Sequence, residues 1–429
     1  MECDPTRMCE LLVGLPDVNV LAVDDTLERL TVVIEVRGPR PLCLGCGVVA
    51  RVKDRDKVLL VDLPVFGRPS RLLWRKYRWK CITTTCPMLT WTTDVPSIAA
   101  SRLALTDRAG RWVTRQVGQH GRSVSDVANE LDCDWHTVNN AVQAYGAPLV
   151  DDPARIGAAN ALGLDETLFV REGERHHKHW ATSIVDVRRG VLLDMIEGRT
   201  AAPSIAWLAG RPQAWRDGID WATLDLSGPY RLVFDTMLPA ARQVADPFHV
   251  IKVVNTALDE CRRRVQNDKL GHRGRKDDPL YRCRRLLTRA DERLDDHGRT
   301  KLVGLLEAGD PHGEVRMAWH AKEVVREIYA HTDPVLAAAF VERLGLDLQH
   351  ESCPIEINRV GRTLLRWKAQ IVAWHTAHVT NAPTEAMNNL IKRIKRVGFG
   401  FRKFAHYRVR ALLYAGKPNW NLLATITPR

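Results

Sequence analysis

The stretch Ala161-Leu-Gly-Leu-Asp165-Glu-Thr-Leu-Phe-Val170 decides how the rest of the chain is interpreted. It is an apolar run of strand length that carries an acid, Asp165, in its middle. An ionised carboxylate inside such a strand is costly unless a cation or another partner compensates its charge. The stretch therefore predicts a buried strand that holds a candidate functional acid.

Working outward from this strand, the pattern predicts a mixed α/β domain. Residues 179–187 and 191–196 form two more strands around an Arg-Arg-Gly turn, and a further buried strand ends in Asp225. Helices and one short strand fill the sequence up to residue 253. Three strands, helix, strand, helix, strand is the order of the RNase H-like fold, which we expect over residues 158–253.

The rest of the C-terminal half is predicted to be helical. Residues 254–378 are rich in Arg and predict an α-helical insertion into the RNase H-like domain. A last helix begins in the segment Asn381-Ala-Pro-Thr384, with Pro383 in its first turn. This helix and the tail, residues 379–429, are expected to complete the domain.

Four cysteines nearer the N-terminus have the spacing of a structural zinc site. Cys43 and Cys46 form a CxxC pair, and Cys81 and Cys86 follow after strand-like sequence. Two such knuckles joined by a β segment can present four thiolates to one tetrahedral ion, which predicts a zinc ribbon over residues 1–98. The alternative is two unrelated pairs of reduced thiols. The remaining cysteines are interpreted as packing or incidental thiols: Cys3, Cys9, Cys133, Cys261, Cys283 and Cys353.

Residues 99–150 are predicted to form a helix-turn-helix. Ser123 is a good N-cap, and Asp126 follows three residues later, which is close to a capping box. A short turn then leads to a second helix that starts at Trp135 and would enter a DNA major groove. The alternative is an ordinary structural pair of helices.

Two more acids join Asp165 as candidates for metal chemistry. Asp225 ends a buried strand, and Glu385 lies early in the last helix, whose apolar face would pack on the sheet. Converging carboxylates repel one another and need divalent cations, and hard Mg²⁺ (or Mn²⁺) prefers oxygen ligands. Two such ions activate a water or a 3′-OH at a phosphodiester. The alternative is that each acid is only a cap or a solvated strand end.

Several motifs, in order from about residue 43 to 415, make the chain similar to known proteins. They are the paired Cys knuckles, the helix-turn-helix, Gly163-Leu-Asp-Glu-Thr, Leu224-Asp-Leu-Ser-Gly-Pro-Tyr, Ala245-Asp-Pro-Phe-His-Val-Ile-Lys and Asn381-Ala-Pro-Thr-Glu-Ala-Met-Asn-Asn. In this combination the chain resembles the DDE transposases of bacterial insertion sequences, specifically the ISL3 family.

The resemblance implies which residues carry the chemistry. It puts the catalytic, metal-binding triad on Asp165, Asp225 and Glu385, although Glu166 and Asp235 leave open which neighbouring acid is the ligand. It also implies an active-site role for Asp246 and His249, which could instead be a simple capping pair. Beside these residues, His176, His177 and His179 are interpreted as a solvated or DNA-facing turn.

The net charge suggests a polyanion as the partner. The chain has 63 Lys and Arg against 51 Asp and Glu, a formal charge of +12, and such an excess favours association with nucleic acid. Two basic segments are predicted to contact DNA phosphates, one in the helical insertion and one after Glu385. The alternative for each is a solvated helical face. The residues are Arg262, Arg263, Arg264, Lys392, Arg393, Lys395, Arg396, Arg402 and Lys403.

Together these features predict a DNA transposase. The zinc ribbon and helix-turn-helix would bind the terminal inverted repeats, and the RNase H-like domain would cut and join DNA strands with two Mg²⁺ ions. We expect a cytoplasmic, nucleoid-associated bacterial protein without a membrane span that acts as a homodimer or larger assembly on transposon ends and target DNA. The alternatives are a non-catalytic DNA-binding regulator derived from a transposase and a simple metal-dependent nuclease.

Overall fold

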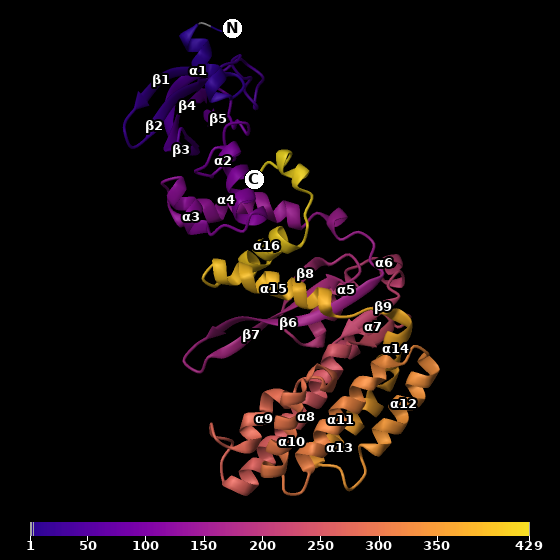
Figure 1. Ribbon diagram of the computed structural model, residues 1–429. Coiled ribbons are helices and arrows are strands. Elements are labelled where there is room, and N and C mark those ends of the chain that lie inside the picture. Colours follow the sequence, from indigo (N-terminus) through magenta and orange to yellow (C-terminus); the bar gives the residue numbers. More distant parts are fainter. Residues whose placement is uncertain (1, 3, 429) are drawn as a thin grey trace. The chain divides into compact units, whose positions relative to one another are not determined.

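The computed structural model describes residue 2 and residues 4–428 (Figure 1). The chain divides into two compact units. The first comprises Met1–Gly157 together with Asn389–Arg429, and the second comprises Ala158–Asn388. Among the described residues, no helix is both long and apolar enough to cross a membrane.

The first unit begins with a short helix and a sheet. Helix α1 (Pro5–Val13) precedes the sheet, whose strands follow the order β1-β2-β4-β3, with β5 paired to β4. Strands β3 and β4 are long and antiparallel, whereas β2 and β4 are parallel. Their inward side chains, among them Ile34, Leu60 and Leu72, form the core of this part. The strands are β1 (Val18–Asp25), β2 (Leu30–Val36), β3 (Arg51–Val65), β4 (Arg68–Lys80) and β5 (Thr90–Thr92).

Helices make up the rest of the first unit. Ser123 caps α3 by accepting a hydrogen bond from the Asp126 N–H at 3.0 Å, as its position before an apolar run predicts. The side chain of Arg71 on β4 is buried and donates to the Leu131 and Asp132 carbonyls, so the sheet fixes the turn between α3 and α4. The helices are α2 (Asp107–Thr114), α3 (Val124–Glu130), α4 (Trp135–Val150) and α16 (Phe404–Ala415), with the π-helical turn Arg115–Gln119 after α2.

The second unit contains a mixed five-stranded sheet of order β10-β9-β6-β7-β8, counted over the described residues. The hairpin order makes β6, β7 and β8 antiparallel, and the helices between β8, β9 and β10 return the chain so that β9 and β10 run parallel to β6. The strands are β6 (Ala161–Glu172), β7 (His177–Asp186), β8 (Val191–Glu197), β9 (Trp221–Leu224) and β10 (Arg242–Ala245); the connecting helices are α5 (Ala201–Ala209), α6 (Gln213–Asp217) and α7 (Gly228–Met237).

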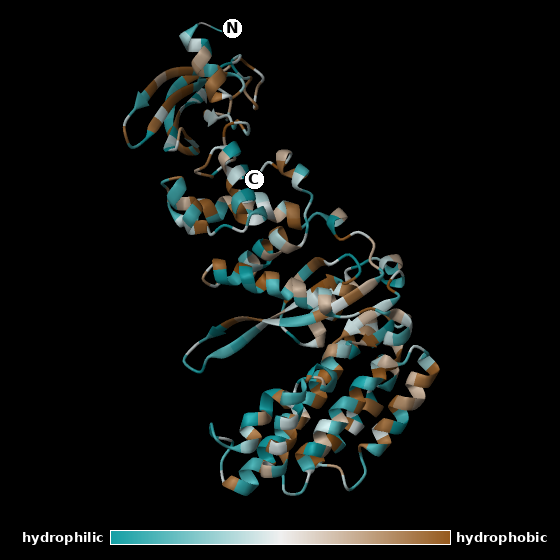
Figure 2. Cartoon of the chain, in the orientation of Figure 1, coloured by the Kyte–Doolittle hydropathy of each residue, from teal (hydrophilic) through white to brown (hydrophobic). Residues whose placement is uncertain are grey.

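A helical region follows β10 within the same unit. It starts with the 24-residue helix α8, which Asp246 caps, and Figure 2 shows hydrophobic and hydrophilic residues alternating along its helices. Such stripes are typical of amphipathic helices that pack against one another. The helices are α8 (Pro247–Leu270), α9 (Pro279–Leu287), α10 (Asp296–Gly309), α11 (Glu314–Glu327), α12 (Pro334–Asp347), α13 (Ile355–Arg366) and α14 (Lys368–Ala377), and α15 (Ala382–Val397) continues the chain.

The hairpin of β6 and β7 extends beyond the rest of its sheet, and its end is hydrophilic (Figures 1 and 2). His176, His177 and His179 all lie in this exposed segment. His179 approaches Glu172 at 3.5 Å, and none of the three belongs to a cluster with metal-binding geometry among the described residues. The hairpin therefore presents these histidines to solvent.

Candidate active site and metal centres

Strands β6 and β9 bring three acids together. Gly163 pairs with Thr223 in this parallel pair, so the residues that follow on each strand lie at the same edge of the sheet. Ligand atoms of Asp165, Glu166 and Asp225 all lie within 4.8 Å of one another. The sheet thus produces the convergence that the two strand acids predict, with Glu166 as its third member.

Burial and repulsion between the carboxylates raise the pKa of two of these acids, Asp165 and Glu166. Desolvation first, and then the negative charges of Asp225 and Glu166, raise the pKa of Asp165 to about 6 in spite of the hydrogen bond from the Glu166 N–H. Desolvation and then Asp225 also raise the pKa of Glu166. Each carboxylate therefore carries an electrostatic cost that a cation would remove.

The donor set fits a hard divalent cation. Three carboxylates supply only oxygen atoms, which Mg²⁺ and Mn²⁺ prefer. Asp225 Oδ1 is buried and has no hydrogen-bond partner among the described residues. A buried acceptor of this kind normally has a partner, and a bound cation would provide one.

Helix α15 is anchored to the sheet at Gly163. A Cβ atom on Gly163 would lie 2.3 Å from Thr384 Oγ1, 2.7 Å from Val187 Cγ1 and 2.9 Å from Thr223 Oγ1, so only glycine allows the helix to approach this closely. Asn381 adds polar anchors: its Oδ1 accepts from the Thr223 hydroxyl at 3.1 Å. These contacts explain the Asn-Ala-Pro-Thr segment as the start of a helix docked on β6 and β9.

The same helix contacts the acids directly. Asn388 Nδ2 donates to Asp165 Oδ2 at 2.6 Å, and the Ser183 hydroxyl on β7 donates to Asn388 Oδ1 at 2.8 Å. Asn388 is 2% exposed. Its amide therefore holds one oxygen of Asp165 in a fixed orientation, while the other oxygen accepts from the Glu166 N–H at 2.8 Å.

Glu385 lies in the first turn of α15, beside His249 and outside the three-acid cluster. Its Oε1 is 3.7 Å from His249 Nε2, while His249 Nδ1 is 3.8 Å from Asp246 Oδ1. Asp246 is buried, caps α8 and accepts from the Asn381 N–H at 2.5 Å, so it also ties the start of α15 to α8. The geometry thus places His249 between Glu385 and Asp246.

The sequence does not single out two residues that contribute to this site, Glu166 and Asn388. The sequence offers Glu166 only as an alternative ligand to Asp165, and strand alternation argues against two adjacent side chains serving one site. Asn388 is one of two consecutive asparagines, and nothing in their spacing says which one meets Asp165. The signal available for both was their position inside the motifs Gly163-Leu-Asp-Glu-Thr and Glu385-Ala-Met-Asn-Asn.

The four predicted zinc ligands come together in the first unit. Strands β3 and β4 pair Arg51 with Lys80, so the knuckle before β3 and the knuckle after β4 meet at one end of the hairpin. The Sγ atoms of Cys43 and Cys86 are 3.7 Å apart, and those of Cys46 and Cys81 are 3.5 Å apart.

This cluster has the chemistry of a structural zinc site. All four sulfur atoms lie within 4.8 Å of one another. The Val48 N–H, followed by Thr83 and Cys81, lowers the pKa of Cys46 to about 6. In spite of the Met88 N–H, desolvation and hydrogen bonds to the other three thiols raise the pKa of Cys86 to about 12, so a bound cation is needed to hold all four as thiolates. Four thiolates at such distances suit zinc. Cys9 lies outside the cluster, and Cys3 lies outside the described residues.

The basic residues of the helical region are engaged by acids. Arg262 is 4% exposed and pairs with Asp259 at 2.7 Å. Arg264 pairs with Glu314 at 2.5 Å and with Glu356 at 2.8 Å. Arg263, which is more exposed, also contacts Asp259. Their predicted contact with DNA stays a prediction; in this structure Arg264 links α8 to α11 and α13, whereas Arg262 and Arg263 pair within α8.

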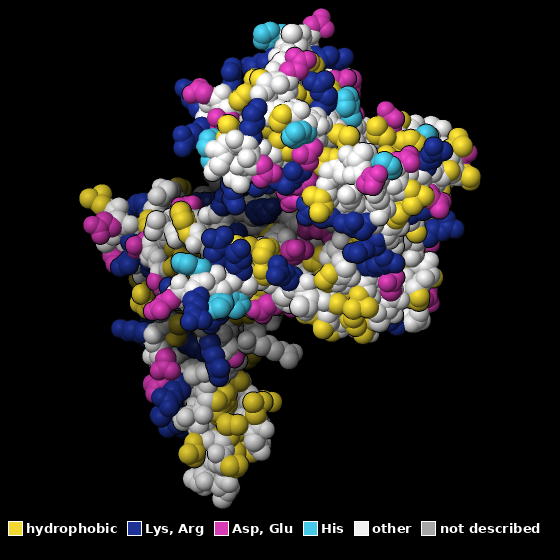
Figure 3. All heavy atoms as spheres, turned by 90° about the horizontal axis from the view of Figure 1, so that it is seen from below, with side chains coloured by type: hydrophobic (Ala, Val, Ile, Leu, Met, Phe, Trp, Pro, Cys, Tyr) yellow, Lys and Arg dark blue, Asp and Glu magenta, His cyan; other side chains and the backbone are white. Residues whose placement is uncertain are grey.

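The basic residues after Glu385 are placed differently. Most of them are exposed, and Arg393 lies over the ring of Tyr414 at 5.7 Å. Elsewhere, on the face that Figure 3 shows, Lys and Arg side chains are interspersed with Asp and Glu. The exposed residues of this segment are Lys392, Arg393, Arg396, Arg402 and Lys403.

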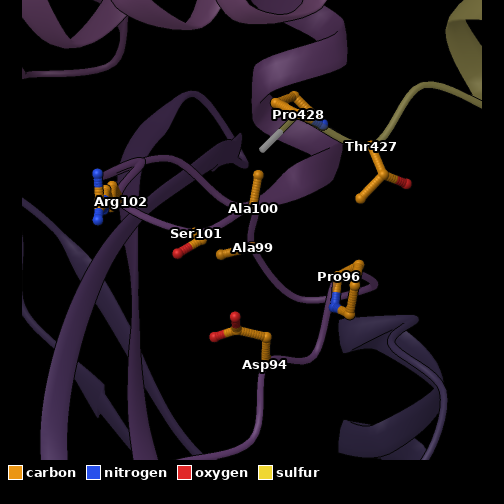
Figure 4. Close-up of a pocket in the computed structure, with 8 residues that line it drawn as sticks. All are labelled: Asp94, Pro96, Ala99, Ala100, Ser101, Arg102, Thr427 and Pro428. Carbon is orange, nitrogen blue, oxygen red and sulfur yellow. The ribbon is translucent and has the colours of Figure 1, made fainter.

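A surface pocket in the first unit shows no comparable chemistry. It is lined by residues of the segment 94–102 together with Thr427 and Pro428 (Figure 4). Its acid, Asp94, pairs with Lys76 at 3.1 Å. Small and apolar side chains form most of the remaining wall, so we assign the pocket no part in the site.

Comparisons with known proteins agree with this geometry. A family model described as a transposase, of the DDE type and the ISL3 group, matches residues 162–411, which is more than half of the chain. The transposase for insertion sequence element IS1001 of Bordetella parapertussis is 24% identical over 401 residues, covering 90% of this chain and 92% of that relative. The transposase for element IS1557 of Mycobacterium tuberculosis is 25% identical over 397 residues, covering 83% and 86%.

Proposed function

The chain belongs to the ISL3 family of DDE transposases, and from this premise we propose that it cleaves and joins DNA strands at the ends of an insertion sequence with two divalent cations. The observation that carries the proposal is the cluster of Asp165, Glu166 and Asp225 at one edge of the sheet. Three converging carboxylates, two of them (Asp165 and Glu166) with a raised pKa and the third (Asp225) with an unpartnered buried oxygen, have little use in a protein that only binds DNA.

The topology of the second unit supports an RNase H-like catalytic domain. The elements follow the order expected from the sequence (three strands, helix, strand, helix, strand), and in the sheet β6, β7 and β8 are antiparallel while β9 and β10 run parallel to β6. In this proposal, the region from α8 to α14 is a helical insertion between the last strand and helix α15. Asn381 and Thr384, packed at Gly163, then set where α15 delivers Glu385 and Asn388.

We assign the cations to Asp165 and Asp225, with Glu166 or Glu385 completing the set. When bound, the cations would polarise the phosphodiester and lower the pKa of the attacking water or 3′-OH. Asn388 keeps Asp165 oriented, and Ser183 keeps the Asn388 amide from flipping. His249 lies between Asp246 and Glu385, with its Nε2 3.7 Å from Glu385 Oε1, and we assign it the exchange of a proton at Nε2.

The first unit is proposed to recognise the transposon ends. A four-cysteine zinc ribbon and the helices α3 and α4 are the parts expected to bind terminal inverted repeats. The start of α4 supports this role, because Trp135 and His136 are exposed in its first turn, whereas buried residues follow from Val138 onward. Arg71 would keep the turn before α4 rigid against the sheet.

Handling two ends at once suggests that two or more copies act together on DNA. Light scattering of the complex with end-bearing DNA should give the mass of at least two chains. A single peak at the mass of one chain bound to DNA would contradict this assembly.

The test of the function is a cleavage and strand-transfer assay. The substrate is a DNA fragment with the sequences that flank the coding region, incubated with the full chain and Mg²⁺. We expect Asp225→Asn to lose both reactions. Asp235→Asn is the matched control, because Asp235 is an exposed acid on α7 that contacts Arg231 and Gln243. If Asp225→Asn is as active as the parent, the cluster is not the catalytic site.

A further inference from the structure

The loop between α15 and α16 presents a phenylalanine in an unusual backbone conformation. Helix α15 ends with two hydrogen bonds, from the Phe399 N–H to the Arg396 carbonyl at 3.0 Å and from the Gly400 N–H to the Lys395 carbonyl at 2.9 Å. Phe399 has a φ of 50°. These bonds form the Schellman pattern that closes many helices, and Phe399 occupies its left-handed position.

That position is one that glycine normally fills, because a Cβ atom is disfavoured in the left-handed region. Here glycines flank the position on both sides, at Gly398 and Gly400, yet the strained residue itself is an aromatic one. Gly398 has a packing reason, since a Cβ there would lie 3.0 Å from the Phe401 ring. Phe399 has no comparable packing reason, because its side chain is exposed.

The phenylalanine is also almost fully exposed. Phe399 is 95% exposed. By contrast, the ring of Phe401 lies 5.1 Å from that of Tyr407, and the ring of Phe404 lies 6.5 Å from it. Of the three phenylalanines in this segment, Phe399 alone is left in solvent, and it occupies a backbone position that is disfavoured for a residue with a Cβ atom; the two features together point to a binding partner.

The surroundings indicate the chemistry of that partner. Five exposed cations flank the loop, and residues 386–429 contain no Asp or Glu. An apolar protein surface placed on Phe399 would desolvate these cations without pairing them. A nucleic acid instead offers phosphates for the cations and base faces for the ring. The five are Lys392, Arg393, Arg396, Arg402 and Lys403.

We propose that Phe399 is a wedge that stacks on a DNA base at an opened or kinked base step, while the flanking cations hold the phosphates. Aromatic and aliphatic side chains that insert between base pairs unstack them and bend the duplex. The inference rests on the DNA binding in the proposed function, and it adds a contact with bases to the contacts with phosphates. Distortable DNA should therefore be bound more tightly than regular duplex.

The test compares two fluorescein-labelled duplexes of the same arbitrary sequence, one fully paired and one with a single mismatched base pair. Fluorescence anisotropy with the full chain, without added divalent cation, gives the two Kd values. We expect the mismatched duplex to bind about tenfold more tightly, since a mismatch lowers the cost of opening a step for a stacking side chain. Phe399→Gly should abolish this preference, and Phe399→Trp should retain it.

The stability of the variant separates this role from a structural one. Phe399→Gly places the preferred residue at a left-handed position, so its Tm should equal or exceed that of the parent. If Phe399 instead had a structural role, the Phe399→Gly variant would have a lower Tm than the parent. An unchanged preference in Phe399→Gly, or a parent that binds both duplexes equally, would overturn the proposal.

The chain offers a matched control in the turn between β3 and β4. Phe66 is 87% exposed, has a φ of 50° and precedes Gly67, but its basic neighbour Arg68 already pairs with Asp25. Phe66→Gly should leave the preference for mismatched DNA unchanged.

A second variant separates base contacts from phosphate contacts. Lys392→Gln with Arg393→Gln should reduce the slope of log K against log salt by about 2 without removing the preference, since each phosphate contact contributes about 0.9. Because the binding assay needs no cleavage, a chain that prefers mismatched DNA but never cuts would refute the proposed catalysis and leave this inference intact.

Discussion

At the scale of single residues, the active-site acids weaken the fold that holds them. Asp165 lies in a strand among apolar neighbours, and burial raises its pKa to about 6. Asp225 adds a second negative charge whose buried oxygen has no partner among the described residues. These buried carboxylates stabilise the protein only once a cation is bound. Without metal they lower its stability, and in the proposed function this cost favours binding of the cations.

Because the buried carboxylates repel one another, Asp225→Asn should raise the free energy of unfolding in the absence of divalent cations. The negative charge of Asp225 raises the pKa of Asp165 and of Glu166. A carboxyl whose pKa is higher in the folded state binds its proton more tightly there, so the fold loses stability as the pH rises from about 4 to above 6. We expect the zinc-loaded, Mg²⁺-free variant to gain about 1–2 kcal/mol at about pH 8 and nothing at about pH 4.

Urea unfolding at the two pH values measures this difference. Asp235→Asn provides the comparison. Asp235 is an exposed acid that lies 3.7 Å from Arg231, and it does not belong to the buried three-acid cluster. It should change the stability by less than about 0.5 kcal/mol at both pH values. A destabilised Asp225→Asn at the higher pH would show that the charges do not repel one another as the geometry implies.

The sequence predicted part of this site and not all of it. Asp165 and Asp225 could be recognised because a carboxylate inside an apolar strand is conspicuous, and the family confirms the chain as a DDE transposase. Glu166 could not be chosen, because its side chain reaches the cluster through local strand geometry that the pattern does not encode. The assignment of Glu385 stays a prediction, with His249 as its neighbour in this structure.

At the scale of elements, the close contact between β6 and α15 joins parts of the chain that are distant in sequence. Gly163→Ala would place a methyl group 2.3 Å from Thr384 Oγ1 and 2.9 Å from Thr223 Oγ1, so α15 must shift. Overpacking of this kind costs about 1–3 kcal/mol. We expect that loss in urea unfolding, and a larger loss of cleavage, because a shifted helix misplaces Asn388.

A double-mutant cycle tests the cause. Thr384→Ala removes the nearest of the clashing atoms, so the double variant should recover part of the stability lost by Gly163→Ala. Gly304→Ala is a control within the same unit, because no atom lies within 4 Å of a Cβ at that helical position. Strict additivity of Gly163→Ala and Thr384→Ala would mean that the two residues do not meet.

Helix α8 shows how a run of charges can be structural. Arg264 bridges Glu314 and Glu356, and Glu356 is 4% exposed. Desolvation alone would raise the pKa of Glu356, and the hydrogen bond and charge of Arg264 reverse this. Arg264→Met should therefore destabilise the protein by about 2–3 kcal/mol, because it leaves a buried carboxylate without its partner.

The matched variant is Arg263→Met, one residue earlier. Arg263 is 42% exposed and pairs with an equally accessible Asp259, so we expect a change below about 1 kcal/mol. Urea unfolding compares the two. The sequence shows three consecutive arginines and gives no means to tell them apart, because only the packing of α8 against α11 and α13 decides which one meets a buried acid. Equal effects of the two substitutions would contradict this distinction.

At the scale of the whole molecule, the first compact unit combines two segments that are far apart in the sequence. Residues 389–429 return to the first unit, where Leu413 of α16 packs at Gly118 and Gly146. The two glycines allow this approach, since a Cβ on either would lie within 3.0 Å of Leu413. Periodicity predicts the helices but not this return, because it depends on contacts between residues about 270 to 295 positions apart.

The separate units predict separate responses to zinc removal. Cys43→Ser should reduce the zinc content from about one ion per chain and lower the stability of the first unit, because its sulfur is one of four that close the end of the β3–β4 hairpin. The second unit holds none of these ligands. Metal analysis and thermal unfolding should therefore show lost zinc and a shift in one of two transitions.

Cys9→Ser distinguishes loss of the metal from loss of a thiol. Cys9 lies in the same unit but outside the four-cysteine cluster, so its replacement should change neither zinc content nor either transition. Full zinc content in Cys43→Ser would refute the site. Loss of zinc with both transitions lowered together would show instead that the two units unfold as one, because the helix α15 that crosses their boundary would then couple them.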